Sequence, residues 1–257
     1  MSYRTIAKVY DSINRDVDYK SWADFFEKCV SRYQTIEPGI LLDLACGTGR
    51  MSEELTRRGY DVIGLDSSGE MLTLAQKRKE KGHLDKLLLL QQDMRDFELY
   101  GTVQSVLCCL GSLNYLTSTR DLNLCLDRIR NYLEPGGILL FDVDTPYKFQ
   151  KVYRDRSYLF EGELPDGKEY VCTWQSDFRP GSGLCRFYLN YFFSREDGTY
   201  VREEETQTEK CYSEKVLRKA LEENRLECLG FFTDFSFRET GDDPQAERWY
   251  IVARRKE

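Results

Sequence analysis

The sequence lacks the cysteine and histidine pattern of a zinc site. Its only histidine is His83, and although it has nine cysteines, no two of them form a Cys-x-x-Cys pair. A structural zinc site needs about four such ligands at close spacing, so we expect no metal. The odd cysteine count, with Cys108 and Cys109 adjacent in an apolar run, argues against a disulfide scaffold and favours a reducing, cytoplasmic location.

An excess of positive charge and long apolar runs are also missing. The 37 Lys and Arg residues are outnumbered by 44 Asp and Glu, for a net charge of −7. Proteins dedicated to nucleic acids usually present a basic surface, so we expect no nucleic-acid partner. No run approaches the roughly 18 apolar residues of a membrane helix, and Met1–Arg4 lack the apolar core of a signal peptide. We therefore expect no membrane association.

Short apolar runs alternate with helical patterns between residues 40 and 144. The strands are expected at 40–44, 60–65, 87–91, 103–110 and 138–143. Helices are expected over 49–58, 67–81 and 122–133, with a turn at Pro135–Gly137. A helix after Ser213 and strands near 226–233 and 247–254 complete seven strands. Continuously apolar strands alternating with helices predict an α/β fold whose doubly wound, mostly parallel sheet is covered on both faces.

Residues 146–212 interrupt this pattern. They hold 15 of the 34 aromatic residues, and three antiparallel strands are expected at 169–177, 184–194 and 200–212. The chain is therefore divided into a core, residues 1–145 and 213–257, and an inserted antiparallel β module, residues 146–212. The run Glu203–Glu205 is interpreted as a solvated edge that discourages strand pairing.

Three polar motifs follow the first three strands of the core. They are the loop Asp43–Gly49, then Asp66, then Gln92-Asp93-Met94. Glycines at a strand–helix junction allow a tight turn and close approach to a ligand, and Asp66 is placed to accept two ribose hydroxyls. Each motif alone is weak, because an aspartate after a strand is often only a helix cap. In series at the carboxyl ends of parallel strands, they predict a nucleotide-like ligand.

The spacing does not match a dinucleotide fingerprint, because Ser52 stands where the third glycine belongs. Instead, Asp43–Gly49 resembles the signature loop of S-adenosylmethionine-dependent methyltransferases with a Rossmann-like core. The resemblance covers residues 40–144 and, more loosely, the helix and two strands after 212. It implies S-adenosylmethionine as the cofactor, with ribose on Asp66 and adenine on Asp93 and Met94.

The resemblance also implies an N-terminal aromatic cover over the cofactor. Residues 18–34 have the periodicity of a helix, and the N-terminal helices present Tyr10, Tyr19 and Trp22, although Trp22 fits packing in the core equally well. The full set of expected cofactor contacts is Tyr19, Trp22, Asp43, Ala45, Cys46, Gly47, Gly49, Asp66, Ser67, Met71, Asp93, Met94, Leu110 and Ser112.

Further motifs resemble a bacterial branch of small-molecule methyltransferases, similar to enzymes that methylate amino groups of sugars. They are Tyr10-Asp11, Asp18-Tyr19-x-x-Trp22, Ser112-Leu113-Asn114-Tyr115, Phe141-Asp142 and Glu247-Arg248-x-Tyr250. The branch often has aspartate where this chain has Gly111, so a substrate role there is either absent or moved to Asp142 or Asp144. Tyr115, Asp142 and Tyr147 are the candidate catalytic residues that contact substrate, and no motif makes one of them a base.

The resemblance implies transfer of a methyl group to nitrogen or oxygen of a small-molecule acceptor by in-line displacement, with catalysis mainly by orientation. Two alternatives stay open: a macromolecular acceptor such as tRNA or protein, and a non-catalytic cofactor-binding module. We expect a monomer or homodimer. We also expect residues 146–212 to form a lid that sets acceptor choice and contributes little to cofactor affinity.

Overall fold

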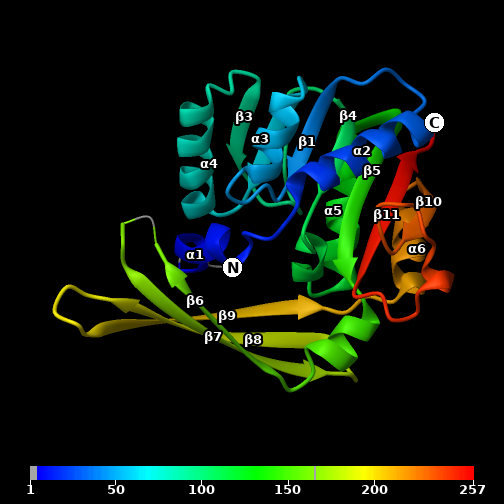
Figure 1. The fold of residues 1–257 in the computed structure, drawn as a ribbon. Helices are drawn as coiled ribbons and strands as arrows, with labels where there is room; N and C mark the ends of the chain where they lie inside the picture. Colours follow the sequence, from blue (N-terminus) through cyan, green and yellow to red (C-terminus); the bar gives the residue numbers. More distant parts are fainter. Residues whose placement is uncertain (1–4, 165) are drawn as a thin grey trace.

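The chain forms a seven-stranded sheet with a separate four-stranded sheet beside it (Figure 1). This computed structural model describes residues 5–164 and 166–257; Met1–Arg4, where no signal peptide is expected, lie outside them. The order of the large sheet is β10-β11-β5-β4-β1-β2-β3. Its strands are β1 (Ile40–Leu44), β2 (Asp61–Asp66), β3 (Leu87–Gln91), β4 (Val103–Cys108), β5 (Leu133–Asp144), β10 (Leu226–Phe232) and β11 (Arg248–Arg255).

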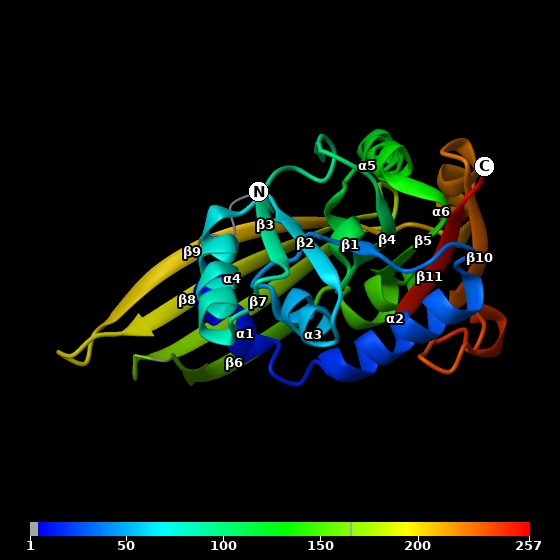
Figure 2. The ribbon, with the colours of Figure 1, turned by 90° about the horizontal axis from the view of Figure 1, so that it is seen from above.

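Strands β1 to β5 pair in parallel, and β11 runs antiparallel to both β5 and β10. Helices cover both faces of the sheet, as Figure 2 shows. On one side are α2 (Tyr19–Tyr33), α3 (Arg50–Arg57) and α4 (Gly69–Gly82); on the other are α5 (Thr119–Tyr132) and α6 (Glu214–Glu223). The predicted α/β fold with a mostly parallel seven-stranded sheet is confirmed. Within the described residues, no helix is long and apolar enough to cross a membrane.

Strand β5 is longer than the sequence predicts. Pro135–Gly137 does not form a separate turn before the strand but lies inside it, where the register with β4 shifts between Val103 and Ser105. The register shift marks a β-bulge, where the ladder of hydrogen bonds between the strands is interrupted. An irregular segment such as Pro135–Gly137 can therefore lie within the strand.

The second sheet has one strand more than the sequence predicts. Its order is β6 (Ser157–Glu163), β7 (Glu169–Arg179), β8 (Leu184–Ser194) and β9 (Tyr200–Lys210), all antiparallel, preceded by a short π-helical turn, η2 (Lys148–Val152). The missed strand is β6, an edge strand. Burial alternates along β8, so the sheet has a buried aromatic face and an exposed outer face.

The short helix α1 (Ile6–Ile13) lies between the two sheets (Figure 1). Its buried residues Ile6, Ala7 and Val9 pack in one cluster with the aromatic face of the β6–β9 sheet. The interpretation of Glu203–Glu205 as part of an edge strand is confirmed, because β9 lies at the edge of its sheet, but two of the three side chains are not simply solvated. Glu203 and Glu205 face inward and bind the start of α1, because alternate side chains of a strand point to opposite faces.

Candidate functional site

The loop after β1 turns sharply at the point where the sheet order reverses. Strand β1 pairs with β4 on one side and β2 on the other, and crevices at such reversals bind ligands in open α/β sheets. Ala45, Gly47 and Gly49 all have left-handed backbone conformations, with φ of 59°, 54° and 76°. The Cys46 N–H donates to the Leu65 carbonyl at 3.0 Å, which ties the loop to β2.

A cavity of about 240 Å³ opens at this edge of the sheet. Its walls come from the ends of β1 to β4 and from α1. Nine of the predicted cofactor contacts line it: Ala45, Gly47, Asp66, Ser67, Met71, Asp93, Met94, Leu110 and Ser112. The candidate catalytic residue Tyr115 also lines it, and so do Tyr10, Leu65, Gln92, Arg95, Leu116, Thr117 and Asp121.

Asp66 is the buried carboxylate of this cavity. Each of its oxygens accepts one backbone N–H at 2.8 Å, from Gly47 and from Ser68. Burial raises its pKa and these N–H groups act against that rise. The N-cap of α4 is Ser68, whose hydroxyl accepts from the Met71 N–H, so Asp66 is not itself the cap. Each oxygen keeps further acceptor capacity toward the cavity.

In the motif that follows β3, Asp93 forms an ion pair with Arg95. Arg95 donates to both of its oxygens, at 2.9 Å from Nε and 2.5 Å from Nη2, and holds the pKa of Asp93 below its usual range. Arg95 also lies 3.7 Å from Asp121. The sequence reading missed Arg95 and Asp121, and the only local signal was a cation two residues after the motif aspartate.

A smaller cavity of about 20 Å³ lies on the other side of the glycine loop. Predicted Tyr19, Asp43 and Cys46 line it, together with Arg50, whose guanidinium lies 4.7 Å from the centre of the Tyr19 ring. Asp43 accepts from Ser52 Oγ, and burial raises its pKa to about 7. Arg50, directly after the loop glycine, is a second cation that the sequence reading missed.

Two predicted contacts lie away from both cavities. Trp22 is 4 % exposed and packs edge-to-face on Phe235 and Tyr250, in the apolar cluster between α2 and the sheet. Gly49 begins α3, and a Cβ there would meet the Cβ of Ala75 at 3.0 Å, so it serves helix packing. A cofactor role for Trp22 stays a prediction that its position does not support.

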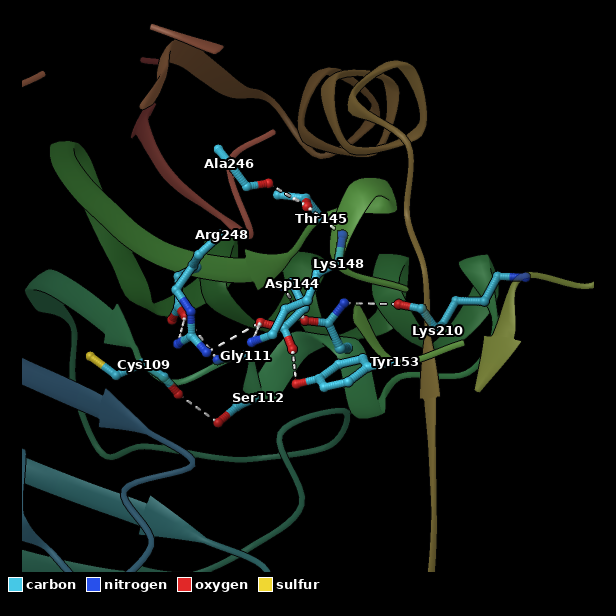
Figure 3. Close-up of polar contacts among 12 residues, drawn as sticks. Cys109, Gly111, Ser112, Asp144, Thr145, Lys148, Tyr153, Lys210, Ala246 and Arg248 are labelled. Atoms are coloured by element: carbon cyan, nitrogen blue, oxygen red, sulfur yellow. Dashed lines mark hydrogen bonds and ion pairs between the residues drawn. The ribbon is translucent and has the colours of Figure 1, made fainter. Parts of the chain in front are cut away.

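Two buried carboxylates meet a half-buried guanidinium beside the cavity, where β5 and β11 run side by side (Figure 3). Arg248 donates from Nη1 to Asp142 and from Nη2 to Asp144 at 3.2 Å. Burial raises the pKa of Asp142, and Arg248 opposes that rise. The second oxygen of Asp142, Oδ1, is buried with no hydrogen-bond partner among the described residues.

The charge cluster also binds the module. Asp144 accepts from Lys148 Nζ at 3.1 Å and from the Tyr153 hydroxyl at 2.8 Å (Figure 3). A Cβ on Gly111 would lie 3.3 Å from Asn114 Oδ1 and 4.0 Å from the Asp144 carboxyl, so both side chains border the region into which a side chain at 111 would project. The hypothesis that a role at 111 has moved to Asp144 therefore has a geometric basis, and it stays a hypothesis.

The three candidate catalytic residues are placed differently. Tyr115, in the 3₁₀ turn η1 (Ser112–Tyr115), lines the large cavity and donates to Gln207 Oε1 at 2.9 Å. Asp142 is fully buried, and the Gly111 N–H donates to it at 3.0 Å, so it braces the loop and Arg248 rather than facing the cavity. Tyr147 is half-buried before η2 and lines neither cavity.

Comparison with known proteins fits this geometry. Residues 41–137 match a methyltransferase domain family. The chain is 31% identical over 256 residues to YqeM of Bacillus subtilis (strain 168), whose name assigns it provisionally to the methyltransferases; the match spans 99% of this chain and 98% of that protein. The chain belongs to the S-adenosylmethionine-dependent methyltransferases.

Two further comparisons bear on this methyltransferase. A solved S-adenosylmethionine-dependent methyltransferase from Clostridium acetobutylicum ATCC 824 superimposes with a TM-score of 0.85 at 29% identity, over 99% of each chain. A dTDP-3-amino-3,4,6-trideoxy-alpha-D-glucopyranose N,N-dimethyltransferase from Streptomyces venezuelae is 36% identical over 151 residues, which is 58% of this chain and 60% of that one.

The residues of the two cavities fit S-adenosylmethionine. The methyltransferase cofactor has ribose hydroxyls, which would donate to the Asp66 carboxylate, and an adenine amine, which would donate to Asp93, whose oxygens also accept from Arg95. The cofactor also carries a carboxylate, and Arg50 in the smaller cavity is the cation suited to it. Gly47 would allow close approach, since a Cβ there would meet no atom within 4 Å.

The two loop glycines are expected to respond differently to alanine. Both substitutions cost about 1–2 kcal/mol because a side chain is strained at positive φ. Gly49→Ala should cost about 1–3 kcal/mol more, because its methyl group overlaps Ala75. Gly47→Ala should instead weaken S-adenosylhomocysteine binding about 5- to 150-fold, because its methyl group enters the cavity. Urea unfolding and calorimetry separate the two effects, and a larger stability loss at Gly47 would contradict the assignment.

Proposed function

We propose that this methyltransferase transfers a methyl group to an amine nitrogen of a small polar molecule bound between the core and the β6–β9 module. The observation that carries the proposal is how the large cavity is closed. Tyr115 in its wall donates a hydrogen bond to Gln207 of β9. Tyr10 in its wall belongs to α1, which packs against the module. A site covered in this way by α1 and the module favours a small acceptor over a folded macromolecule.

The net negative charge of the cavity lining disfavours an anionic acceptor. Its wall carries three carboxylates, Asp66, Asp93 and Asp121, against one cation, Arg95, which is paired with Asp93. A tRNA substrate would call for basic residues beside the site, and the described lining offers none that is unpaired. The S. venezuelae relative is named for dimethylation of an amino sugar, and a relative from Halorhodospira halochloris is named glycine/sarcosine N-methyltransferase. Both names describe transfer to nitrogen.

The chemistry then requires little of the protein beyond orientation. S-adenosylmethionine supplies a methyl group on a sulfonium that is already a good leaving group. The core and module would hold the acceptor nitrogen in line and exclude water, which is the contribution that orientation makes to such reactions. The phenol of Tyr115 donates to Gln207, and Asp142 is held by Arg248 and Gly111. The acceptor therefore reacts as the neutral amine, and the ammonium formed by methylation releases its proton to solvent after the product leaves the site.

A transfer assay tests this proposal. With methyl-labelled S-adenosylmethionine, we expect label to enter the cationic low-mass fraction of a bacterial metabolite extract, and not bulk tRNA or protein. Label in tRNA or protein would support a macromolecular acceptor. Binding of S-adenosylhomocysteine by calorimetry, with no transfer to any fraction, would instead identify a non-catalytic module.

A further inference from the structure

Strand β9 presents a row of polar side chains to the core. Glu203, Glu205, Gln207 and Glu209 alternate with exposed residues and all point inward, and Gln207 is 2 % exposed. Gln207 and Glu209 are buried, and Glu203 and Glu205 are half-buried. Polar side chains in such positions, on a sheet whose other inner residues are mostly apolar, are costly unless each is hydrogen-bonded. Their partners therefore indicate what the row is for.

One end of the row holds the wall of the cofactor cavity. The Tyr115 hydroxyl donates to Gln207 Oε1 at 2.9 Å and also hydrogen-bonds the Glu209 carboxyl. The neighbouring Asn114 binds the same strand, because its Nδ2 donates to the Lys210 carbonyl at 2.8 Å. The turn η1 is thus fixed to β9 by two consecutive side chains.

The other end of the row holds the helix that covers the cavity. Glu205 accepts the backbone N–H groups of Thr5 and Ile6 at 3.3 and 3.2 Å, and Glu203 accepts from the Thr5 hydroxyl at 2.9 Å. Thr5 makes no side-chain cap of its own, so Glu205 supplies the acceptor that the first turn of α1 needs. A helix of eight residues is unstable alone, and its position, with that of Tyr10, depends on such contacts.

The two ends are joined by a hydrogen bond within the row. Gln207 Nε2 donates to Glu205 Oε1 at 2.9 Å. A continuous series of hydrogen bonds therefore runs from Tyr115 through Gln207 and Glu205 to the amino end of α1. We propose that Gln207 and Glu205 are positioning residues for methyl transfer: from the module, they fix Tyr115 and Tyr10 against the cofactor cavity. The module is then part of the cofactor site rather than a lid independent of it.

A competing anchor for α1 lies on the core side. Asp11 accepts from the Thr48 hydroxyl at 2.7 Å and from Arg78 at 2.6 Å, and Arg78 Nε donates to the Thr48 carbonyl at 3.0 Å. If this anchor alone placed the helix, loss of the Glu205 contact would leave cofactor binding unchanged. The experiment must therefore measure cofactor binding directly and ask whether the β9 residues act through Tyr115 and Tyr10.

The test is a double-mutant cycle read by calorimetry with S-adenosylhomocysteine. Gln207→Leu and Tyr115→Phe each remove the same hydrogen bond, from the module and from the core, and each should weaken binding about 3- to 10-fold. If Gln207 acts through Tyr115, the double variant should bind S-adenosylhomocysteine no more weakly than whichever single variant binds it more weakly. If the two losses of affinity multiply in the double variant, or if Gln207→Leu binds as the parent does, the proposal is overturned.

The second arm compares two adjacent glutamates. Glu205→Gln should weaken S-adenosylhomocysteine binding to a similar extent. In a protein that already carries Tyr10→Phe, Glu205→Gln should cause a smaller loss of affinity. Glu204→Gln is the matched control, because Glu204 lies on the outer face and pairs with Arg202; it should bind normally. Equal binding in both glutamate variants would contradict the proposal for α1. Melting temperatures confirm that every variant is folded. Because the ligand is S-adenosylhomocysteine alone, the outcome does not depend on the proposed acceptor.

Discussion

Replacement of Arg248 by methionine is expected to lower the free energy of unfolding by about 3–5 kcal/mol. The guanidinium bridges Asp142 and Asp144, whose side chains are 0% and 6% exposed. Without it, two buried carboxylates from the same strand lose their shared cation, and Asp142 already has one oxygen without a partner in the described structure. Urea unfolding of variant and parent measures the loss.

The loss from Arg248→Met should depend on pH. Burial raises the pKa of Asp142 even with Arg248 present, and removal of the cation raises it further. A carboxyl group whose folded pKa exceeds its unfolded pKa destabilises the fold above the unfolded value, near 3.9, and most fully above the folded value. The difference between variant and parent should therefore shrink as the pH falls from 8 toward 5. A difference independent of pH would show that lost packing, rather than unpaired charge, causes the effect.

Arg202→Met provides the control for this prediction. Arg202 lies on the outer face of β9 and pairs with Glu204, and both side chains are more than half exposed. Exposed pairs contribute about 0–1 kcal/mol, so this variant should unfold nearly as the parent does at every pH. A comparable loss there would mean that the buried setting of Arg248 is not what matters.

The sheet could be predicted from the sequence because its signal is local. The apolar runs of β1 to β5 and the glycines at the end of β1 can each be recognised from a few consecutive residues. Strand β6 does not, because an edge strand needs no continuous apolar face: Leu159 is 64% exposed, and Gly162 interrupts the pattern. Pro135–Gly137 signals a turn locally, and only the pairing of β5 with β4 places it inside a strand.

The motif residues of the site could also be predicted from the sequence, but the ion pairs of the site could not. Asp66 and Asp93 follow strands at readable spacings, and both line the cavity. Arg248 lies more than 100 residues from its partners Asp142 and Asp144, so no local pattern links them. The run Glu203–Glu205 misled for a related reason, because which of its members is buried depends on the position of α1 across the sheet.

The same contacts bear on the predicted lid. The sequence suggested that residues 146–212 contribute little to cofactor affinity, because every cofactor motif precedes residue 100. The aromatic face of the module, however, packs on α1, and α1 brings Tyr10 to the cavity wall. The role of the module in acceptor choice and its small contribution to cofactor affinity both stay predictions, and the packing of α1 is the observation on which our proposal departs from the second.

The carboxylate of Asp66 should contribute more to cofactor affinity than any other single side chain of the cavity. Asp66→Ala is expected to weaken S-adenosylhomocysteine binding about 10- to 150-fold, since hydrogen bonds to a charged acceptor contribute about 1.5–3 kcal/mol. Calorimetry measures the dissociation constant. Asp61→Ala, at the opposite end of the same strand and beside exposed Lys86, is the matched control and should bind normally.

Asp66 also has a structural role, so stability must be measured together with affinity. Its oxygens accept the N–H groups of Gly47 and Ser68, and loss of both acceptors should lower the free energy of unfolding by about 1–3 kcal/mol. If Asp66 only braces the loop, a fixed excess of S-adenosylhomocysteine should raise the melting temperature of Asp66→Ala as much as that of the parent, because at a given ligand concentration the stabilisation depends only on the dissociation constant. If it accepts the ribose, that increase should shrink at equal ligand concentration, and Asp61→Ala should keep it in full.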